Sequence, residues 1–272
     1  MSDNIFGTKR LNGKVAIVTG ATGGIGRGIA LALAARGAAV AVNGRNEQKA
    51  AAVLDEIESV GGTGIFVPGD VRDRDGMTAV VARTVQLLGR VDIVVPNAGG
   101  NDDEARDPRV RGPFAGIDLA RATAFVGEAL SAKLNIVQAA VPHLVEHGGS
   151  VVFVTSEGGR EPTPGQTAMS AFAGGLVMTS KVLSKELARE GVRVNCVCVT
   201  VVRDSPSWAA VFDGETDVSP QHRKQYERIV QRSPLGVAAP GDIGDVVAFL
   251  ASDESRFLTG AALSPTGGLT VH

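Results

Sequence analysis

Three glycines near the start of the chain are spaced in a way that suits phosphate binding. Gly20, Gly24 and Gly26 follow the apolar stretch 14–19 and precede an apolar helical pattern that ends at Gly37. Glycines let the backbone turn sharply and approach a ligand closely. The free amides at the start of a helix attract anions. The stretch therefore predicts a strand, a turn and a helix that hold the pyrophosphate of a dinucleotide.

The end of the second apolar stretch bears on which dinucleotide is bound. In a dinucleotide-binding fold, an acidic residue there binds the ribose 2′-hydroxyl of NAD, whereas an arginine can pair with the 2′-phosphate of NADP. The chain reads Asn43-Gly44-Arg45 at this point, with no acid. This favours NADP (NADPH) over NAD. The alternative is that Arg45 is a solvated residue that opens the next helix.

The elements that would position these groups alternate regularly. Helical patterns of 10 to 17 residues separate four apolar stretches, at 15–19, 39–43, 64–68 and 91–95. Such alternation implies right-handed crossovers and a parallel sheet covered on both faces. The predicted fold is α/β, a Rossmann-type doubly wound parallel sheet of about seven strands in a single domain over residues 1–272.

Motifs at the strand ends resemble those of the short-chain dehydrogenase/reductase family. The turn from Thr19-Gly20 to Gly24-Ile25-Gly26 matches the family's T-G-x-x-x-G-I-G, and the similarity covers roughly residues 12 to 270. Asp70-Val71 resembles the family's adenine-contacting pair, and Asn97-Ala98-Gly99 resembles its Asn-Ala-Gly turn. The resemblance implies a cofactor site made of Gly20, Thr22, Gly24, Ile25, Gly26, Arg45, Asp70, Val71, Asn97, Ala98, Gly99 and Val202.

The same resemblance implies an altered catalytic site. Family members place an Asn in the long helix, a Ser at the end of the fifth strand and a Tyr-x-x-x-Lys in the next helix. Ser156 matches the Ser, but the Tyr, Lys and Asn positions are Met169, Ala173 and Ala129. A thioether has no proton to give to a developing alkoxide. Loss of a positioned acid costs about 10²–10⁴ in rate.

Few other residues could replace the missing acid. Lys181 lies about 12 Å along the helix from Ala173, too far to take the place of the lysine. Tyr226, the only tyrosine, falls in the variable region after the sixth strand, where it could be a relocated acid. Other polar candidates, each expected to be a structural or exposed group, are Glu157, Glu161, Ser170 and Lys133.

Three segments fall outside the regular pattern. Residues 1–12 form a polar arm. The charged segment 101–113 is either a solvated loop or a lid over the substrate, because it leaves the carboxyl end of the fourth strand. Residues 204–225, rich in Ser, Pro, Asp and Gly, are expected to be a mobile flap over the site.

Composition excludes several classes of function. A net charge of −2 and 44% hydrophobic residues are typical of a soluble protein without a polyanion-binding surface. No run of 18 apolar residues occurs and the start lacks a secretory pattern, so a cytoplasmic location is expected. No nucleic-acid or membrane partner is expected.

The sequence gives little support for a disulfide or for a metal site. Cys196 and Cys198 would lie roughly 6.6 Å apart on one strand face, too far for a relaxed disulfide, and are expected to be buried thiols. His143 and His147 suit an exposed last turn of the long helix better than a metal site.

Three hypotheses for function remain open. The first is an NADP-dependent oxidoreductase with a displaced or dispensable proton donor, acting on a conjugated enone or enoyl substrate, because hydride addition there gives an enolate rather than an alkoxide. The second is a catalytically silent subunit or NADP-sensing partner of an active relative. The third is non-redox chemistry in the same pocket. The family commonly forms tetramers through its two long helices, which implies a homo-tetramer or dimer, or a hetero-oligomer.

Overall fold

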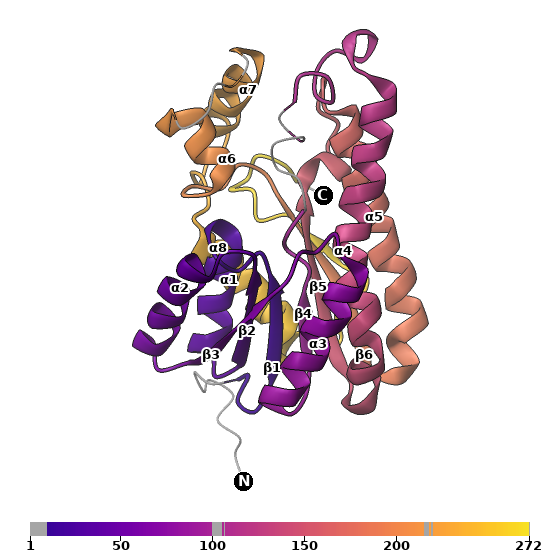
Figure 1. Ribbon diagram of the computed structural model, residues 1–272. Helices are drawn as coiled ribbons and strands as arrows, with labels where there is room; N and C mark the ends of the chain where they lie inside the picture. Colours follow the sequence, from indigo (N-terminus) through magenta and orange to yellow (C-terminus); the bar gives the residue numbers. More distant parts are fainter. Residues whose placement is uncertain (1–9, 100–104, 106, 215–217, 219, 272) are drawn as a thin grey trace.

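The protein is built on one seven-stranded parallel sheet (Figure 1). The computed structural model describes residues 10–99, 105, 107–214, 218 and 220–271. The strand order is β3-β2-β1-β4-β5-β6-β7. The strands are β1 (Val15–Thr19), β2 (Ala39–Gly44), β3 (Thr63–Pro68), β4 (Ile93–Val95), β5 (Gly149–Ser156), β6 (Val192–Val199) and β7 (Ala262–Leu263).

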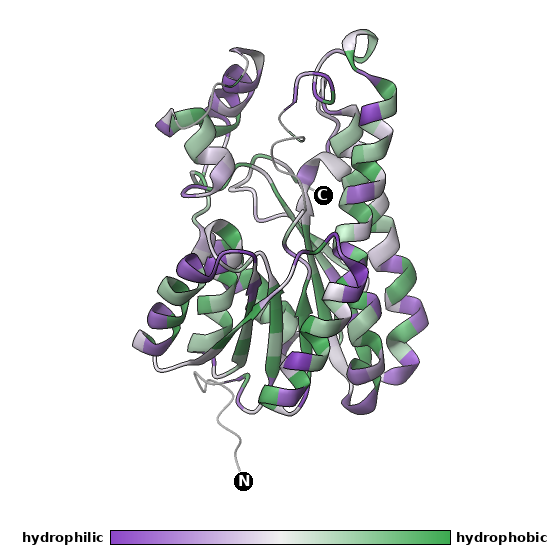
Figure 2. Cartoon of the chain, viewed as in Figure 1, coloured by the Kyte–Doolittle hydropathy of each residue, from purple (hydrophilic) through white to green (hydrophobic). Residues whose placement is uncertain are grey.

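Helices cover both faces of the sheet and bury two separate apolar layers (Figures 1 and 2). One layer packs against α1 (Gly24–Ala35), α2 (Glu47–Ser59) and α8 (Pro240–Ala251). The other packs against α3 (Arg74–Leu88), α4 (Leu119–His147) and α5 (Thr167–Leu187). Strands covered on both faces read as continuous apolar runs, and all five residues of β1 are buried. The predicted α/β fold, with about seven parallel strands in a single domain, is confirmed.

The structure changes the predicted bounds of two segments, the fourth strand and the polar arm. The fourth strand begins at Ile93 rather than at Val91, because the Asp92 carboxylate accepts the amide N–H of Val15 at 2.9 Å before the ladder starts. The predicted polar arm holds one core residue, since Leu11 is buried and donates its amide to the Arg36 carbonyl. Residues 1–9 of that arm lie outside the described part.

The described part of segment 204–225 is largely helical rather than an irregular flap. It contains α6 (Pro206–Trp208), a π-helical turn (Ala209–Asp213) and the start of α7 (Pro220–Gln231). Ser205 begins α6, because its hydroxyl accepts the amide N–H of Trp208 and Pro206 supplies the first helical residue. In Figure 1 these helices stand above the carboxyl ends of the strands.

No helix in the described ranges is both long and apolar enough to cross a bilayer. His147 ends α4, and Gly148 follows it with a positive φ of 70°. In the described residues no group of three or more His, Cys, Asp or Glu side chains could hold a metal ion. Cys196 and Cys198 are free, buried thiols, as predicted.

Candidate cofactor and active site

A cavity of about 1490 Å³ opens where the carboxyl ends of the strands meet the helices α6 and α7. Crevices at this edge of a parallel sheet are the usual ligand sites of doubly wound folds. Eleven of the twelve predicted cofactor residues line it, namely Gly20, Thr22, Ile25, Gly26, Arg45, Asp70, Val71, Asn97, Ala98, Gly99 and Val202. The twelfth, Gly24, contacts the segment that forms the opposite wall, since a Cβ there would lie 3.0 Å from Pro206.

The glycine turn has the geometry of a phosphate cradle. Gly20 and Gly24 have positive φ angles of 65° and 50°. A Cβ atom on Gly26 would lie 2.1 Å from the Gly20 carbonyl oxygen, so only glycine fits. At Gly23, by contrast, an added Cβ would meet nothing within 4 Å. The backbone is therefore tightly packed at Gly26, whereas the space next to Gly23 is open.

The start of α1 is free to bind an anion. Gly23 precedes the helix, no side chain caps it, and no acidic residue lies in the first turn. The first amides of a helix need partners, and a pyrophosphate supplies them. The residues around the turn therefore fit a dinucleotide, whose nicotinamide would supply or accept a hydride.

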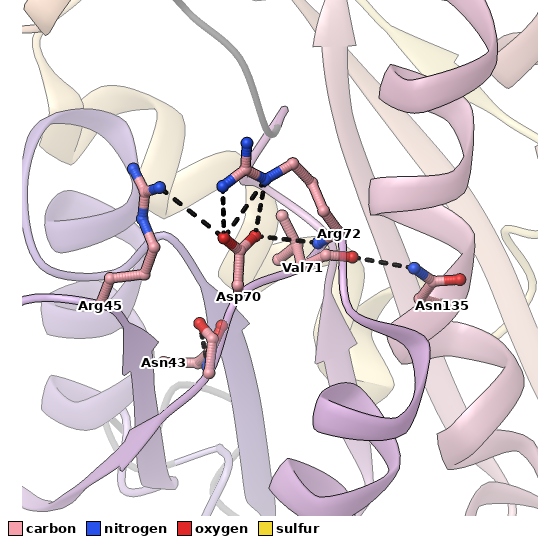
Figure 3. A network of polar contacts seen from close by, with 7 residues as sticks. Asn43, Arg45, Asp70, Val71, Arg72 and Asn135 are labelled. Atoms are coloured by element: carbon pink, nitrogen blue, oxygen red, sulfur yellow. Dashed lines mark hydrogen bonds and ion pairs between the residues drawn. The ribbon is translucent and has the colours of Figure 1, made fainter.

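Basic side chains surround Asp70, at the end of the cavity that is predicted to receive the adenosine (Figure 3). Arg72 holds the Asp70 carboxylate with both its Nε, at 3.0 and 3.2 Å, and its Nη2, at 2.6 Å. Arg45 lies 3.7 Å from the same carboxylate, and its side chain is 69% exposed. Lys49 lines the same region. The side-chain hydrogen bond from Arg72, together with its amide and the nearby charge of Arg45, lowers the pKa of Asp70 to about 2.

The side chain of Asn135, on α4, fixes the turn that carries Asp70. Its Nδ2 donates to the Val71 carbonyl at 2.9 Å (Figure 3). On the other side, Asn43 Nδ2 donates to the carbonyls of Val67 and Gly69. The position of Asp70 and Arg72 is thus set by two buried or partly buried amides.

The middle of the cavity is held by contacts between β1 and β4. The Thr19 hydroxyl accepts the amides of Asn97 and Ala98 at 3.0 and 3.1 Å, and Asn97 Nδ2 donates to the Thr19 carbonyl. An added Cβ on Gly99 would meet nothing within 4 Å. Val202, buried after β6, lines the same space.

The residues expected at the catalytic positions separate into two groups. Ser156, at the end of β5, and Met169, in the first turn of α5, both line the cavity. The Ser156 hydroxyl accepts the Gly158 amide at 3.2 Å. Ala173 and Ala129 are instead buried in the apolar layer and do not line the cavity. Ser156 and Met169 therefore line the same cavity, whereas Ala173 and Ala129 lie outside it, in the apolar layer.

Lys133 is buried one turn after Ala129. Its Nζ donates to the carbonyls of Pro96, Asn97 and Val154 at 3.1, 2.5 and 2.7 Å. It does not line the cavity. The ammonium is therefore a structural group that ties α4 to the ends of β4 and β5, as expected of it.

The other polar candidates lie at different depths. Glu157 is buried and lines the cavity, and its carboxylate accepts the hydroxyls of Ser264 at 2.7 Å and Thr270 at 3.2 Å. Glu161 is exposed at the cavity wall, whereas Ser170 does not line it. Lys181 donates to the Gly260 carbonyl at 3.0 Å and does not line the cavity.

Tyr226 does line the cavity, from α7. The guanidinium of Arg111 lies over its ring, 6.0 Å from the centroid. Arg111, Pro108 and Pro113 come from the described part of segment 101–113 and line the cavity too. The alternatives for this segment are a solvated loop and a lid over the substrate, and its described residues lie at the cavity, where a lid would be.

Sequence reasoning missed six lysine and arginine residues that line the cavity, namely Lys49, Arg72, Arg111, Lys224, Arg228 and Arg232. Arg72 directly follows the Asp70-Val71 motif, and Lys49 follows Arg45 by four residues, so the spacing of both from predicted residues could have indicated them. Arg111 had no such signal, because its partners come from a helix more than a hundred residues later in the chain.

Known proteins resemble the chain over nearly its whole length. The family model described as enoyl-(acyl carrier protein) reductase matches residues 20–270. A 3-oxoacyl-(acyl-carrier-protein) reductase, FabG, of Thermotoga maritima is 33% identical over 96% of this chain and 100% of its own.

Solved structures agree with this. A putative short-chain alcohol dehydrogenase from Sinorhizobium meliloti 1021 matches with a TM-score of 0.82 and 29% identity, over 97% of this chain and 98% of its own. A 7α-hydroxysteroid dehydrogenase, solved with NADH and 7-oxo glycochenodeoxycholic acid, matches with a TM-score of 0.81 and 25% identity, over 96% of both chains. The chain belongs to the short-chain dehydrogenase/reductase family of NAD(P)-dependent oxidoreductases.

Proposed function

We propose that the protein is an NADP-dependent oxidoreductase whose active site departs from the family pattern. The observation that carries this proposal is a contrast within one cavity. The dinucleotide end keeps an uncapped helix start and three basic side chains, Arg45, Lys49 and Arg72. The position aligned with the family's tyrosine offers the thioether of Met169 instead.

The choice of NADP rests on the shape and charge of the adenosine end. A Cβ atom on Gly44 would lie 2.6 Å from Thr22 Cγ2, which leaves no room for the acid that binds a 2′-hydroxyl. Arg45 and Arg72 both lie against Asp70 at this end, where guanidinium groups suit a 2′-phosphate.

The proposed substrate is a conjugated carbonyl compound, an enone or enoyl thioester. Hydride addition at its β-carbon gives an enolate, which is a weaker base than an alkoxide and does not depend on a strong positioned acid. The Ser156 hydroxyl can donate a hydrogen bond to the carbonyl oxygen as negative charge develops there, and solvent can protonate the α-carbon. The matching family model, described as an enoyl reductase, supports this class.

Oxidation of NADPH in the presence of matched enones and saturated ketones tests the proposal. We expect turnover of enones, slower or no turnover of ketones, and a preference for NADPH over NADH. Ser156→Ala should lower kcat by about 10²-fold, as expected for loss of a hydrogen-bond donor to a developing oxyanion. Ser170→Ala, a hydroxyl outside the cavity, should leave it unchanged. Tight NADPH binding without turnover of any carbonyl compound would contradict the proposal.

A second candidate, a catalytically silent subunit that pairs with an active relative, is favoured by one surface feature. Met178 and Val182 lie one turn apart on α5 and are 60% and 48% exposed. Apolar residues at this spacing form a stripe suited to helix packing. Native mass spectrometry of the protein from its own cell decides between the two, because a homo-oligomer that turns over substrate rejects the silent subunit.

A further inference from the structure

Arg111 is a partly buried cation whose contacts with described residues are with the neutral side chains of Gln225 and Tyr226. Its Nη2 donates to Gln225 Oε1 at 2.7 Å, and its guanidinium lies 6.0 Å from the centre of the Tyr226 ring. In the described part of the chain no carboxylate lies within ion-pair distance of it. Its neighbour Arg109, in contrast, is paired with Asp107 at 2.7 Å.

This arrangement is costly for the folded protein. Desolvation lowers the pKa of Arg111, against the opposing effects of Tyr226. A guanidinium stays protonated in proteins, so its charge must be compensated by hydrogen bonds or by an anion. Arg111 lines the cavity, which leaves it open to an anion that enters there.

The surroundings of Arg111 are also basic. Lys224 and Arg228, on α7, and Arg232, directly after it, line the same cavity and are exposed. Three acidic residues in the described part of the chain line the cavity. Asp70 is held by Arg72, Glu157 accepts two hydroxyls, and Glu161 is exposed at the wall, so basic side chains outnumber acidic ones along it. Charge of one sign along a cleft concentrates ligands of the opposite sign.

A second donor lies beside the guanidinium. The Oε1 atom of Gln225 accepts a hydrogen bond from Arg111, while the Nε2 atom of the same amide is buried and has no hydrogen-bond partner in the described residues. A buried donor without a partner is unfavourable. Besides the N–H group that Gln225 accepts, the Arg111 guanidinium carries further N–H groups, and a planar fork of such groups suits the two oxygens of a carboxylate.

We propose that Arg111, held by Gln225 and Tyr226, binds a carboxylate group of the substrate. The inference deepens the proposed function and rests on it in one respect, that this cavity receives the substrate. It restricts the substrate class to conjugated carbonyl compounds that also carry a free carboxylate. Arg111 is then the residue that selects acids over their esters.

Binding to the NADP⁺-loaded protein, which has no hydride to transfer to the probe, is measured by calorimetry and tests the inference independently of turnover. The probes are 4-oxopent-2-enoate and its methyl ester, which differ only in the charged group. A charge-assisted hydrogen bond contributes about 1.5–3 kcal/mol, so the acid should bind roughly 10- to 100-fold more tightly than the ester. Equal affinity for acid and ester would overturn the proposal, whether or not either compound is reduced.

Three variants assign the effect to Arg111. Arg111→Met removes the charge and keeps the bulk, and Gln225→Glu neutralises the guanidinium with an internal carboxylate. Both should abolish the preference for the acid. The matched control is Arg83→Met, because Arg83 also donates to a glutamine oxygen at 2.7 Å but lies on α3, outside the cavity. A preference that survives in both cavity variants would overturn the proposal.

A competition experiment distinguishes a carboxylate from a phosphate group at the same site. Acetate should displace 4-oxopent-2-enoate at lower concentration than inorganic phosphate does, because the planar fork of one guanidinium matches two oxygens rather than three. Displacement by phosphate alone would overturn the carboxylate assignment.

Discussion

The side chain of Thr22 fills the space beside Gly44, since a Cβ atom on Gly44 would lie 2.6 Å from Thr22 Cγ2. Gly44 ends β2, at the point where NAD-binding members of such folds carry an acid. The glycine turn and the second strand are therefore matched to each other, and a larger residue at position 44 requires a smaller one at position 22.

Exchange of Gly44 for aspartate should destabilise the protein when made alone and should be tolerated when Thr22 is changed to alanine as well. Gly44→Asp should lower the free energy of unfolding by about 1–3 kcal/mol through overpacking against Thr22. Thr22→Ala removes the two closest atoms, so the double variant should recover stability and bind NADH more tightly than the wild type does. Urea unfolding and NADH titration of both single variants and the double variant measure this coupling. Additive effects of the two changes would contradict the contact as its cause.

Two neighbouring glycines of the turn should respond in opposite ways to alanine. A Cβ on Gly26 would lie 2.1 Å from a backbone oxygen, so Gly26→Ala should abolish NADPH binding and destabilise the fold. Gly23 has an extended backbone, and nothing lies within 4 Å of an added Cβ. Gly23→Ala should therefore bind NADPH as the wild type does. Loss of binding in both variants would mean that the open space above Gly23 is itself needed by the cofactor.

Acid should remove the contribution of Asp70 to stability over a defined pH range. Its pKa of about 2, lowered first by the Arg72 side chain, is below the ordinary value of 3.8. The ionised carboxylate therefore favours the folded state above about pH 4, and this preference is lost as the pH falls from about 4 to about 2. The difference in unfolding free energy between wild type and Asp70→Asn should be constant from about pH 5 to 8 and shrink below pH 4.

Chemical unfolding at several pH values measures that difference. Asp55→Asn is the control, because Asp55 is exposed on α2, away from the cavity, and should change stability by less than about 0.5 kcal/mol. A difference for Asp70→Asn that persists undiminished at about pH 2 would contradict the ion pair with Arg72 as its source.

Sequence alone predicted the features that depend on the backbone. The apolar run of β1 needs cover on both faces, and the glycines of the turn are needed for close approach, so both leave a direct pattern in the sequence. For Lys133 the pattern in the sequence is weaker. Lys133 lies on the same helical stripe as Ala129, Ile136 and Ala140, all buried, which is a sign that its side chain points inward.

Other parts of the site could not be predicted, because their meaning depends on distant partners. An arginine in a charged loop gives no indication that Gln225 and Tyr226 will surround it, and Arg111 became informative only with α7 in place. The helical form of segment 204–225 was missed because Ser, Pro and Asp suit helix starts as well as loops.

A tyrosine at position 169 should confer some of the activity that the family pattern leads one to expect. Met169 lines the cavity, so a phenol in its place can reach a ligand there, whereas Met178 is exposed on the outer surface of the same helix. Met169→Tyr should raise the turnover of saturated ketones, by at most about 10²–10⁴-fold, the range for a positioned acid. The gain should fall near the lower end, since Ala173 supplies no ammonium to lower the pKa of the phenol.

The matched variant Met178→Tyr adds the same phenol outside the cavity and should leave ketone turnover unchanged. Steady-state oxidation of NADPH with one enone and its saturated ketone measures both variants. If Met169→Tyr leaves ketone reduction as slow as in wild type while NADPH still binds, then position 169 does not face the reacting carbonyl. The absence of a proton donor there could then no longer explain the preference for conjugated substrates.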